Sequence, residues 1–299
     1  MRVVRVMDEC YIDGQWVKAS GGVTLDVVNP ATEAVAGRVS LAGDADVDSA
    51  VKAARRAFDA FSRTSPRYRV KLLESVLVEY RRRATDLAEA VTEEMGAPAN
   101  LAINSQVGLG DAQLATAAAV LKDYRFEEDH GATRIVREPI GVCALITPWN
   151  WPLNQIACKI APALATGCTM VLKPSELAPS SARIFAEVLD SAGVPAGAFN
   201  LVHGDGPTVG AALSRHPLVD LVSITGSTRA GVAVAINAAT TVKRVLQELG
   251  GKNPFIVLDD DELPRGVATC VASAMNNAGQ SCNAPSRLLV PAARMGEAA

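Results

Sequence analysis

The chain has 299 residues, of which 49% are hydrophobic and 20% are charged, and its formal net charge is −3. These values are typical of a folded protein with about two domains and exclude a disordered chain. The small net charge offers no surface suited to nucleic acid or to an anionic membrane, and no apolar run is long enough to span a bilayer.

The cysteines indicate the cellular compartment, and the histidines indicate whether a metal site is expected. The six cysteines form neither CxxC pairs nor a disulfide framework, which favours reduced thiols and a cytoplasmic location. No N-terminal segment has the pattern of a secretory signal. The three histidines, His130, His203 and His216, are scattered, so we expect no His-based metal site.

The first part of the chain predicts a hairpin followed by helices. Residues 11–17 alternate around an Asp-Gly turn, which is a hairpin signal. Apolar residues at helical spacing then predict helices that begin at Asp44 and at Pro66, with a stop at Gly96 and a further Ala-rich helix over 101–122.

A polar, alternating segment follows at about 124–140, with a turn at His130–Gly131. We interpret it as an extended arm or hairpin. It is either a plain surface hairpin or an arm that pairs subunits, and the residues alone leave both open.

From residue 142 onwards, short apolar runs alternate with helical patterns. Strands are expected at 142–146, 169–172, 199–202, 221–224 and 255–258. Helices are expected at roughly 153–165, 179–192, 207–215 and 227–239. This order predicts an α/β fold with a Rossmann-like parallel sheet covered by helices on both faces. Ligands of such sheets bind at the carboxyl ends of the strands.

The first of these strand ends carries a stiff loop. Thr147, Pro148, Trp149 and Asn150 follow directly, and the prolines and tryptophans around Asn150 hold one amide in place. A rigid amide donor can stabilise an oxyanion. The alternative is a packed structural turn.

The second strand end carries Lys173, Ser175 and Glu176. A lysine and a glutamate leaving one strand can bind the two hydroxyls of a ribose, and the acidic residue favours NAD over NADP because it accepts a bond from a free 2′-hydroxyl. The alternative is an exposed ion pair.

Two later turns offer backbone N–H groups. Gly206 lies in a glycine turn, 203–210, whose GxGxxxG spacing is only a weak dinucleotide signal. Gly226 and Ser227 follow the next strand and open a helix, where a phosphate could bind. Ser227 could equally serve only as an N-cap.

Two side chains could carry the chemistry itself. Glu248 lies between apolar residues beside two glycines, so we expect a partly desolvated carboxylate that acts as a general base. Cys282 lies in a small-residue turn, 276–285, which is typical of an accessible nucleophile. The alternative for Cys282 is a small buried hydrophobe.

Taken together and in this order, these motifs resemble the NAD(P)-dependent aldehyde dehydrogenase superfamily. The matching stretches are Pro148-Trp149-Asn150, Lys173-Pro174-Ser175-Glu176, Thr225-Gly226-Ser227-Thr228, Glu248-Leu249-Gly250-Gly251-Lys252 and Gly279-Gln280-Ser281-Cys282, with Asp13-Gly14-Gln15-Trp16 and Asn29-Pro30-Ala31-Thr32 near the N-terminus. The resemblance covers nearly the whole chain.

The resemblance implies roles for the catalytic residues. Cys282 would be the nucleophile that forms a thiohemiacetal with an aldehyde, with Asn150 and the Cys282 backbone N–H holding the oxyanion. Glu248 would activate the water that hydrolyses the resulting thioester to the acid. Lys159 matches a lysine near the cofactor and catalytic centre, or it is a solvated helix lysine.

For the cofactor, the resemblance assigns Lys173 and Glu176 to the ribose, Trp149 and Ser227 to the pyrophosphate, and Leu249 and Gly250 to the region of the nicotinamide. It further implies an NAD-binding domain at 1–250 and the beginning of a second α/β catalytic domain at 251–299. The arm at 124–140 would serve oligomerisation, so dimers or tetramers are expected.

The sequence ends early relative to this family, whose members continue well beyond the nucleophile with most of the catalytic domain. We therefore expect a fragment, whose strand at 287–290 would lack sheet partners. Two functions stay open: an NAD-dependent aldehyde dehydrogenase, and an NAD-binding fragment without turnover. A CoA-acylating relative is a weaker third, because Glu248 supplies a hydrolytic base that such an enzyme can dispense with. The particular aldehyde is not specified.

Overall fold

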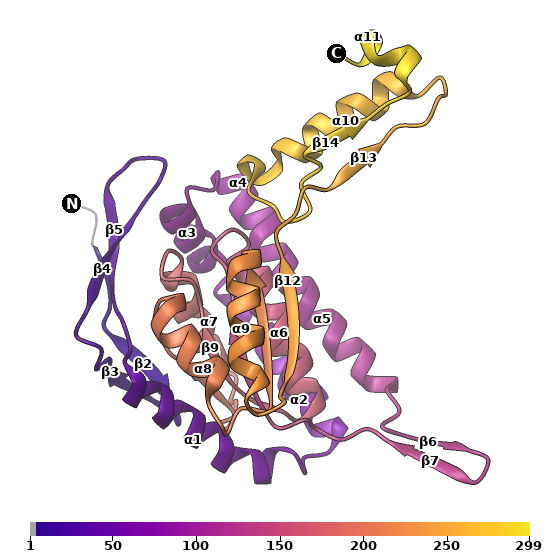
Figure 1. Ribbon diagram of the computed structural model, residues 1–299. Coiled ribbons are helices and arrows are strands. Elements are labelled where there is room, and N and C mark those ends of the chain that lie inside the picture. Colours follow the sequence, from indigo (N-terminus) through magenta and orange to yellow (C-terminus); the bar gives the residue numbers. More distant parts are fainter. Residues whose placement is uncertain (1–3) are drawn as a thin grey trace. The chain divides into compact units, whose positions relative to one another are not determined.

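The computed structural model describes residues 4–299. The chain forms two compact units, Met1–Glu248 and Leu249–Ala299, which are described separately below. Figure 1 follows the chain through both of them. Among residues 4–299, no helix combines the length and the apolar character needed to cross a bilayer.

A seven-stranded sheet in the order β12-β11-β8-β9-β10-β2-β3 forms the centre of the first unit. Its strands are β2 (Glu9–Ile12), β3 (Gln15–Lys18), β8 (Val142–Ile146), β9 (Thr169–Lys173), β10 (Phe199–Leu201), β11 (Leu221–Gly226) and β12 (Arg244–Leu249). Strands β8 to β11 pair in parallel, which confirms the predicted sheet. The predicted N-terminal hairpin is β2–β3, and it joins the sheet antiparallel to β10.

Alternate residues of the strands belong to two different cores. In β8, Cys143 and Leu145 contact one core, whereas Val142, Ala144 and Ile146 contact the other. Because side chains alternate along a strand, a continuous apolar run buries both faces of the sheet.

Helices cover both faces, as expected (Figure 1). Helices α2 (Pro66–Arg82), α3 (Ala84–Met95), α5 (Gly108–Asp123), α6 (Pro152–Thr166) and α7 (Pro179–Ser191) pack in the first core. Helices α1 (Asp44–Phe61), α8 (Ala211–Arg215) and α9 (Thr228–Ala239) pack in the second. The predicted stop at Gly96 is confirmed, since this residue ends α3 in the left-handed conformation with φ +71°.

The helix predicted over 101–122 is not continuous. A short α4 (Ala99–Leu101) leads into a π-helical turn, η1 (Ala102–Val107), and α5 begins only at Gly108. A π-turn has i→i+5 hydrogen bonds and often marks a functional position in a helix. Tyr80 from α2 is fully buried beside it and donates a hydrogen bond to the Val107 carbonyl at 3.0 Å.

The segment predicted as an arm is a hairpin of β6 (Glu127–His130) and β7 (Thr133–Val136). Figure 1 shows it projecting beyond the end of α5. Nearly all of its residues are exposed, and an ion pair of 2.8 Å between Arg134 and Asp129 links the two strands. The role of this hairpin in oligomerisation stays a prediction.

A second small sheet in this unit was not predicted. Strands β1 (Arg5–Met7), β5 (Val35–Ser40) and β4 (Thr24–Val28) form it in that order, around a small core of Met7, Val27, Val39 and Leu41. Its strands mix charged and apolar residues without clear alternation, so they lack the pattern from which a strand could be predicted.

The second unit corrects two expectations. The strand expected at 255–258 was assigned to the main sheet, but β13 (Pro254–Ile256) instead pairs in parallel with β14 (Arg287–Leu289). The strand at 287–290, which was expected to lack partners, therefore has one. Helices α10 (Leu263–Met275) and α11 (Met295–Ala298) and the short turns η3 (Asn276–Gly279) and η4 (Ala292–Arg294) complete this unit.

A buried carboxylate joins α3 to α7 in the first unit. Glu94 accepts hydrogen bonds from the backbone N–H of Ser180 at 2.7 Å and of Ser181 at 3.1 Å, and from the Ser181 hydroxyl. These groups lie at the N-terminus of α7, where a carboxylate satisfies free backbone donors. Burial raises the pKa of Glu94 to about 7, although the bonds from Ser181 and Ser180 lower it.

This pKa predicts how stability depends on pH. Between the ordinary pKa of 4.5 and about 7, the folded chain keeps a proton on Glu94 that the unfolded chain releases. The free energy of unfolding should therefore fall as pH rises through this window, by up to about 1.4 kcal/mol per pH unit from this group. Urea midpoints at pH 5, 6 and 7 measure it. Glu94→Gln should flatten this part of the profile, whereas Glu89→Gln, at an exposed position of the same helix, should leave it unchanged.

Candidate active site

Most of the predicted cofactor residues meet at one edge of the first unit. The loop 147–151 follows β8, and residues 174–176 follow β9. The turn before Gly206 follows β10, and Gly226 ends β11. These four strands are parallel neighbours in the order β11-β8-β9-β10, so their carboxyl ends lie side by side. The sheet thus brings together segments that are far apart in the sequence.

The loop after β8 is held in place by backbone contacts. The Thr147 N–H donates to the Lys173 carbonyl at 3.1 Å, which ties the loop to β9. Pro148, Trp149 and Asn150 are half-buried. The Thr147 hydroxyl is buried and has no hydrogen-bond partner among residues 4–299. A buried, unpaired hydroxyl costs free energy unless a ligand or water pairs with it.

Sequence reasoning missed the residue that fixes Asn150. Gln106, from the π-turn, is fully buried and donates from Nε2 to the Asn150 backbone carbonyl at 3.0 Å. This bond orients the loop that presents the Asn150 amide. The sequence offered only a short polar run, Asn104-Ser105-Gln106, within an Ala-rich helical pattern, which is too weak a signal to identify a contact.

Lys173, the last residue of β9, and Glu176 are not an exposed ion pair. Lys173 is only 4% exposed, and its Nζ lies 3.4 Å from Glu176 Oε2. Burial lowers the pKa of Lys173, whereas Glu176 raises it. Ser175 is buried and accepts a hydrogen bond from the Leu177 N–H at 3.2 Å, so it shapes the turn. A buried ammonium next to a half-buried carboxylate forms a polar site that is already arranged to bind a polar ligand.

The two glycine turns differ in detail. Gly206 begins a π-helical turn, η2 (Gly206–Gly210), and a Cβ placed on it would meet nothing within 4 Å. Ser227 is the N-cap of α9, because its Oγ accepts from the Ala230 N–H at 3.2 Å. Ser227 therefore caps α9, whereas a contact of Ser227 or Gly226 with a pyrophosphate stays a prediction.

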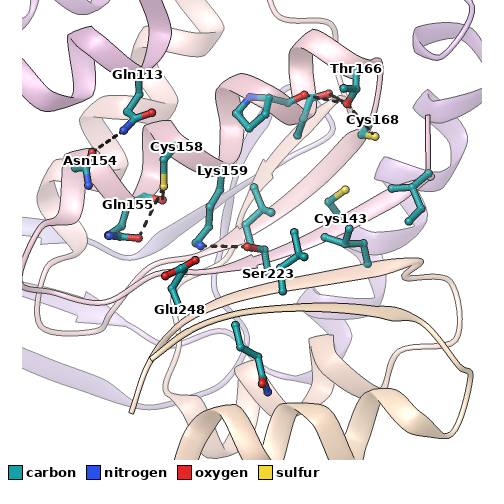
Figure 2. A pocket seen from close by; sticks show the side chains of 17 residues that line it. Gln113, Cys143, Asn154, Gln155, Cys158, Lys159, Thr166, Cys168, Ser223 and Glu248 are labelled. Atoms are coloured by element: carbon teal, nitrogen blue, oxygen red, sulfur yellow. Dashed lines mark hydrogen bonds between the residues drawn. The ribbon is translucent and has the colours of Figure 1, made fainter. Parts of the chain in front are cut away.

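Lys159 lies in a pocket and is not a solvated helix lysine. It is 7% exposed, and its Nζ donates to Ser223 Oγ at 3.1 Å. The pocket has a volume of about 620 Å³ and lies between α6 and strands β8, β11 and β12. Figure 2 shows Lys159 and Glu248 pointing into it from opposite sides. Burial lowers the pKa of Lys159, and the nearby Cys158 and Glu248 raise it.

The expectation of a partly desolvated Glu248 is wrong for this chain. Glu248 is exposed, although it lines the same pocket as Lys159. The reason is its position in β12, which is the edge strand of the sheet and has four exposed residues out of six. The apolar neighbours in the sequence suggested burial, but an edge strand leaves them largely uncovered.

The second unit holds the remaining predicted residues. Cys282 is exposed, and its carbonyl accepts from Asn253 Nδ2 at 2.6 Å. Just before it, Asn277, Ala278 and Gly279 have φ values of 54°, 55° and 73°. Two successive non-glycine residues in the left-handed region store backbone strain, which is common next to functional groups. Leu249 is half-buried and Gly250 is exposed.

Comparison with known proteins decides the family. The family model described as "Aldehyde dehydrogenase family" matches residues 16–298. The chain belongs to the aldehyde dehydrogenase family. The predicted membership and fold class are thereby confirmed.

Individual aldehyde dehydrogenases are similar over nearly the whole chain. A 3-succinoylsemialdehyde-pyridine dehydrogenase of a Pseudomonas species is 59% identical over 97% of this chain. A crystal structure of aldehyde dehydrogenase C from Pseudomonas syringae, a cysteine-to-alanine mutant in complex with NAD+ and octanal, has a TM-score of 0.97, is 50% identical and covers 100% of this chain. Betaine aldehyde dehydrogenase from Staphylococcus aureus in complex with NAD+ has a TM-score of 0.93 and is 35% identical over 97% of this chain.

These relatives are longer than the chain. It spans 61% of the Pseudomonas dehydrogenase, 62% of the Pseudomonas syringae structure and 59% of the Staphylococcus aureus structure.

Proposed function

We propose that the chain carries the NAD-binding part and the nucleophile of an aldehyde dehydrogenase that oxidises an aldehyde to a carboxylic acid with NAD. One observation supports this most strongly. The carboxyl ends of four parallel strands bring together the segments that begin at Thr147, Lys173, Gly204 and Gly226. Dinucleotides bind at such an edge of an α/β sheet.

The residues at this edge fit NAD. Lys173 and Glu176 hold the adenosine ribose through its two hydroxyls, and Glu176 selects against a 2′-phosphate by charge. The N-terminus of α9, a helix of 12 residues, faces the pyrophosphate with its free N–H groups. The unpaired Thr147 hydroxyl supplies a further polar contact at this edge. When bound, NAD accepts the hydride that the oxidation removes from the substrate carbon.

The chain's own residues supply the other steps. The Cys282 thiolate attacks the aldehyde carbonyl and forms a thiohemiacetal. The Asn150 amide and the Cys282 backbone N–H donate hydrogen bonds to its oxygen. After the oxidation, Glu248 removes a proton from a water molecule that attacks the thioester and releases the acid. Lys159, which lines the same pocket as Glu248, is a further cation beside the proposed base.

For the substrate and for the oligomeric state, family membership supports proposals only at a general level. The Pseudomonas syringae relative binds octanal, and we propose a small-molecule aldehyde as the substrate class here. The β6–β7 hairpin is proposed to join copies of the chain into dimers or tetramers, and the protein is proposed to act in the cytoplasm. Residues 1–250 are proposed as the NAD-binding domain and 251–299 as the first part of the catalytic domain.

A second candidate function is NAD binding without turnover. Its support is that Glu248 and Cys282 are both exposed, whereas a base and a nucleophile act best in a water-excluded site. Incubation of the purified chain with NAD and a panel of aldehydes separates the two functions. NADH formation supports the dehydrogenase. Saturable NAD binding without NADH supports the second function, and absence of both contradicts the two proposals.

The ribose contacts predict a change in cofactor affinity. Glu176→Gln should weaken NAD binding by about 10-fold or more, because a hydrogen bond to a charged group is worth about 1.5–3 kcal/mol. The same change should weaken NADP binding less, or strengthen it, because it removes a negative charge near the 2′-phosphate. Fluorescence titration with both nucleotides measures the ratio.

The matched control is Glu33→Gln, which removes one exposed carboxylate at a position distant from Glu176 in the sequence. It should leave both dissociation constants unchanged. An equal loss of NAD affinity in the two variants, or an unchanged ratio in Glu176→Gln, would contradict the assignment of Glu176 to the ribose.

A further inference from the structure

The pocket beside α6 holds a lysine to which the proposed reaction assigns no bond-making step. Lys159 is 7% exposed and lines the cavity of about 620 Å³. Figure 2 shows its side chain reaching from α6 toward Ser223, with Glu248 on the opposite side of the pocket. The nitrogen of a buried lysine in a cavity of this size can meet a small molecule that enters it.

The nitrogen of Lys159 has few partners. Its Nζ donates to Ser223 Oγ at 3.1 Å, and within residues 4–299 it forms no ion pair. An ammonium carries three N–H groups, so two of them lack an acceptor from this part of the chain. The uncharged amine has one donor fewer and no charge to solvate. The surroundings therefore favour the amine more than water does.

The other buried lysines have partners that stabilise the charged form. Lys173 is 4% exposed and lies 3.4 Å from a carboxylate oxygen of Glu176. Lys243 is 9% exposed and donates to two backbone carbonyls, at 3.2 and 2.8 Å. Of the three lysines that are buried within residues 4–299, Lys159 alone has neither a carboxylate nor a carbonyl as its partner.

The charges around Lys159 act in the same direction as these contacts. Burial lowers the pKa of Lys159, against the effect of Cys158 and Glu248, which raise it. The titratable groups that line the pocket with Lys159 are Glu248, Cys143, Cys158 and Cys168. At a given pH, a larger fraction of Lys159 than of an exposed lysine is therefore unprotonated, and the unprotonated amine is the nucleophile.

The walls next to this amine are apolar. Pro162 and Ala163 follow Lys159 by three and four positions, which places them on the same face of α6, and both line the pocket. Leu246 lines it from β12, two positions before Glu248 and on the same face of that strand. This carbon surface beside a nucleophilic nitrogen suits a small apolar carbonyl compound.

We propose that Lys159 is a carbonyl-reactive group in its own right, whose amine condenses reversibly with a small apolar aldehyde to form an imine. The nitrogen attacks the carbonyl carbon, a C–N bond forms and the carbonyl oxygen takes up a proton. The C–O bond of this carbinolamine then breaks. The oxygen leaves as water with the two hydrogens of the amine, and a C=N bond remains.

This condensation involves no oxidation or reduction, so it needs neither NAD nor Cys282. An aldehyde held on Lys159 also occupies the pocket that Glu248 lines. The imine would thus withdraw the aldehyde from oxidation, and release it again by hydrolysis.

Reductive trapping tests the proposal without any enzyme turnover. The full chain is treated with hexanal and sodium cyanoborohydride at pH 7, in the absence of NAD. The hydride reduces an imine to a stable N-hexyl amine, whereas adducts of thiols with aldehydes are not fixed in this way. Peptide mass spectrometry then measures the labelling rate of each lysine. We expect Lys159 to be labelled several-fold faster than Lys71, which is exposed on α2, and Lys173 and Lys243 to be labelled most slowly.

Three controls separate the site from ordinary lysine chemistry. The excess of Lys159 over Lys71 should shrink as the pH rises from 7 to 10, because an exposed lysine also loses its proton as the pH approaches about 10.4. In urea the excess should vanish, since unfolding removes the burial. An aldehyde carried on dextran is too large for the cavity, so it should modify Lys71 and spare Lys159, measured as loss of the unmodified peptides.

Two variants test the neighbouring thiols. Cys282→Ala should give the same labelling pattern as the unmodified chain, because the proposed nucleophile takes no part. Cys158→Ala should keep the label at Lys159, which excludes transfer of the aldehyde from the adjacent thiol.

The proposal would be overturned by equal labelling of Lys159 and Lys71 in the folded chain at pH 7, or by an excess that persists in urea. Equal modification of the two lysines by the dextran aldehyde would overturn the role of the cavity. Loss of the label in Cys158→Ala would assign the reactive group to the thiol instead. None of these results depends on NAD binding or NADH formation, so they leave the proposed function to its own test.

Discussion

Replacing Cys282 with alanine is expected to abolish NADH formation from aldehydes, a loss on the order of 10⁴-fold or more. Without the thiol, no thiohemiacetal forms, and the remaining residues can only bind the two substrates. NAD binding should persist, because Lys173, Glu176 and the α9 N-terminus belong to the other compact unit. NADH absorbance and NAD titration on the same preparation measure the two effects separately.

The matched control for this prediction is Ser286→Ala, which alters an exposed side chain in the same loop region. It should retain the NADH formation of the unmodified chain. If Cys282→Ala keeps a rate comparable to that of Ser286→Ala, the thiol is not the nucleophile. If it loses NAD binding as well, the substitution has damaged the fold and not only the chemistry.

Gly110→Ala is expected to cause the largest loss of stability among single methyl additions in α5. A Cβ at this position would lie 2.2 Å from the Tyr80 hydroxyl oxygen and 2.9 Å from its ring carbon Cζ. The ring cannot retreat easily, because it packs edge-on against Phe185 with centroids 5.5 Å apart and its hydroxyl donates to Val107. Overpacking together with a lost buried hydrogen bond should cost about 2–4 kcal/mol. Thermal unfolding should show a fall in Tm of about 5–12 °C.

Gly108→Ala, in the same helix, provides the comparison. A Cβ on Gly108 would meet nothing within 4 Å. Alanine also has the higher helix propensity, so this variant should gain about 0.5–1 kcal/mol. A Gly110→Ala chain that is as stable as Gly108→Ala would show that Tyr80 can move out of the way.

The parallel sheet could be predicted because its central strands are short, continuous apolar runs in the sequence. The run Val142–Ile146 is apolar at every position, and the structure gives β8 the same bounds. The edge strand next to β11, β12, was not predicted because Arg244–Leu249 contains arginine, glutamine and glutamate. An edge strand tolerates such side chains, so neither its composition nor its alternation separates it from a loop.

The part of the candidate site that lies at the strand ends could be predicted from the sequence. Asn150, Lys173 and Ser227 follow strands whose parallel pairing follows from their order, so their meeting at one edge needed no coordinates. The burial of Lys159 and its bond to Ser223 depended on how α6 lies against β11, which local pattern does not encode. The exposure of Glu248 depended on its strand being at the edge of the sheet.

The π-turn at Ala102–Val107 limits which changes in chain length this helix can survive. A π-turn accommodates one residue more than an α-helical turn. Deleting one residue there would restore regular winding and leave the helical segments on either side in their present rotational positions, because the wider turn takes up the extra residue. Gly110 would then stay beside the Tyr80 ring, whereas Gln106, which lies inside the π-turn, would lose its place beside the Asn150 carbonyl. The extra residue of this segment therefore serves the position of Gln106, and a single-residue deletion here should disturb the loop that presents Asn150 more than the helix itself.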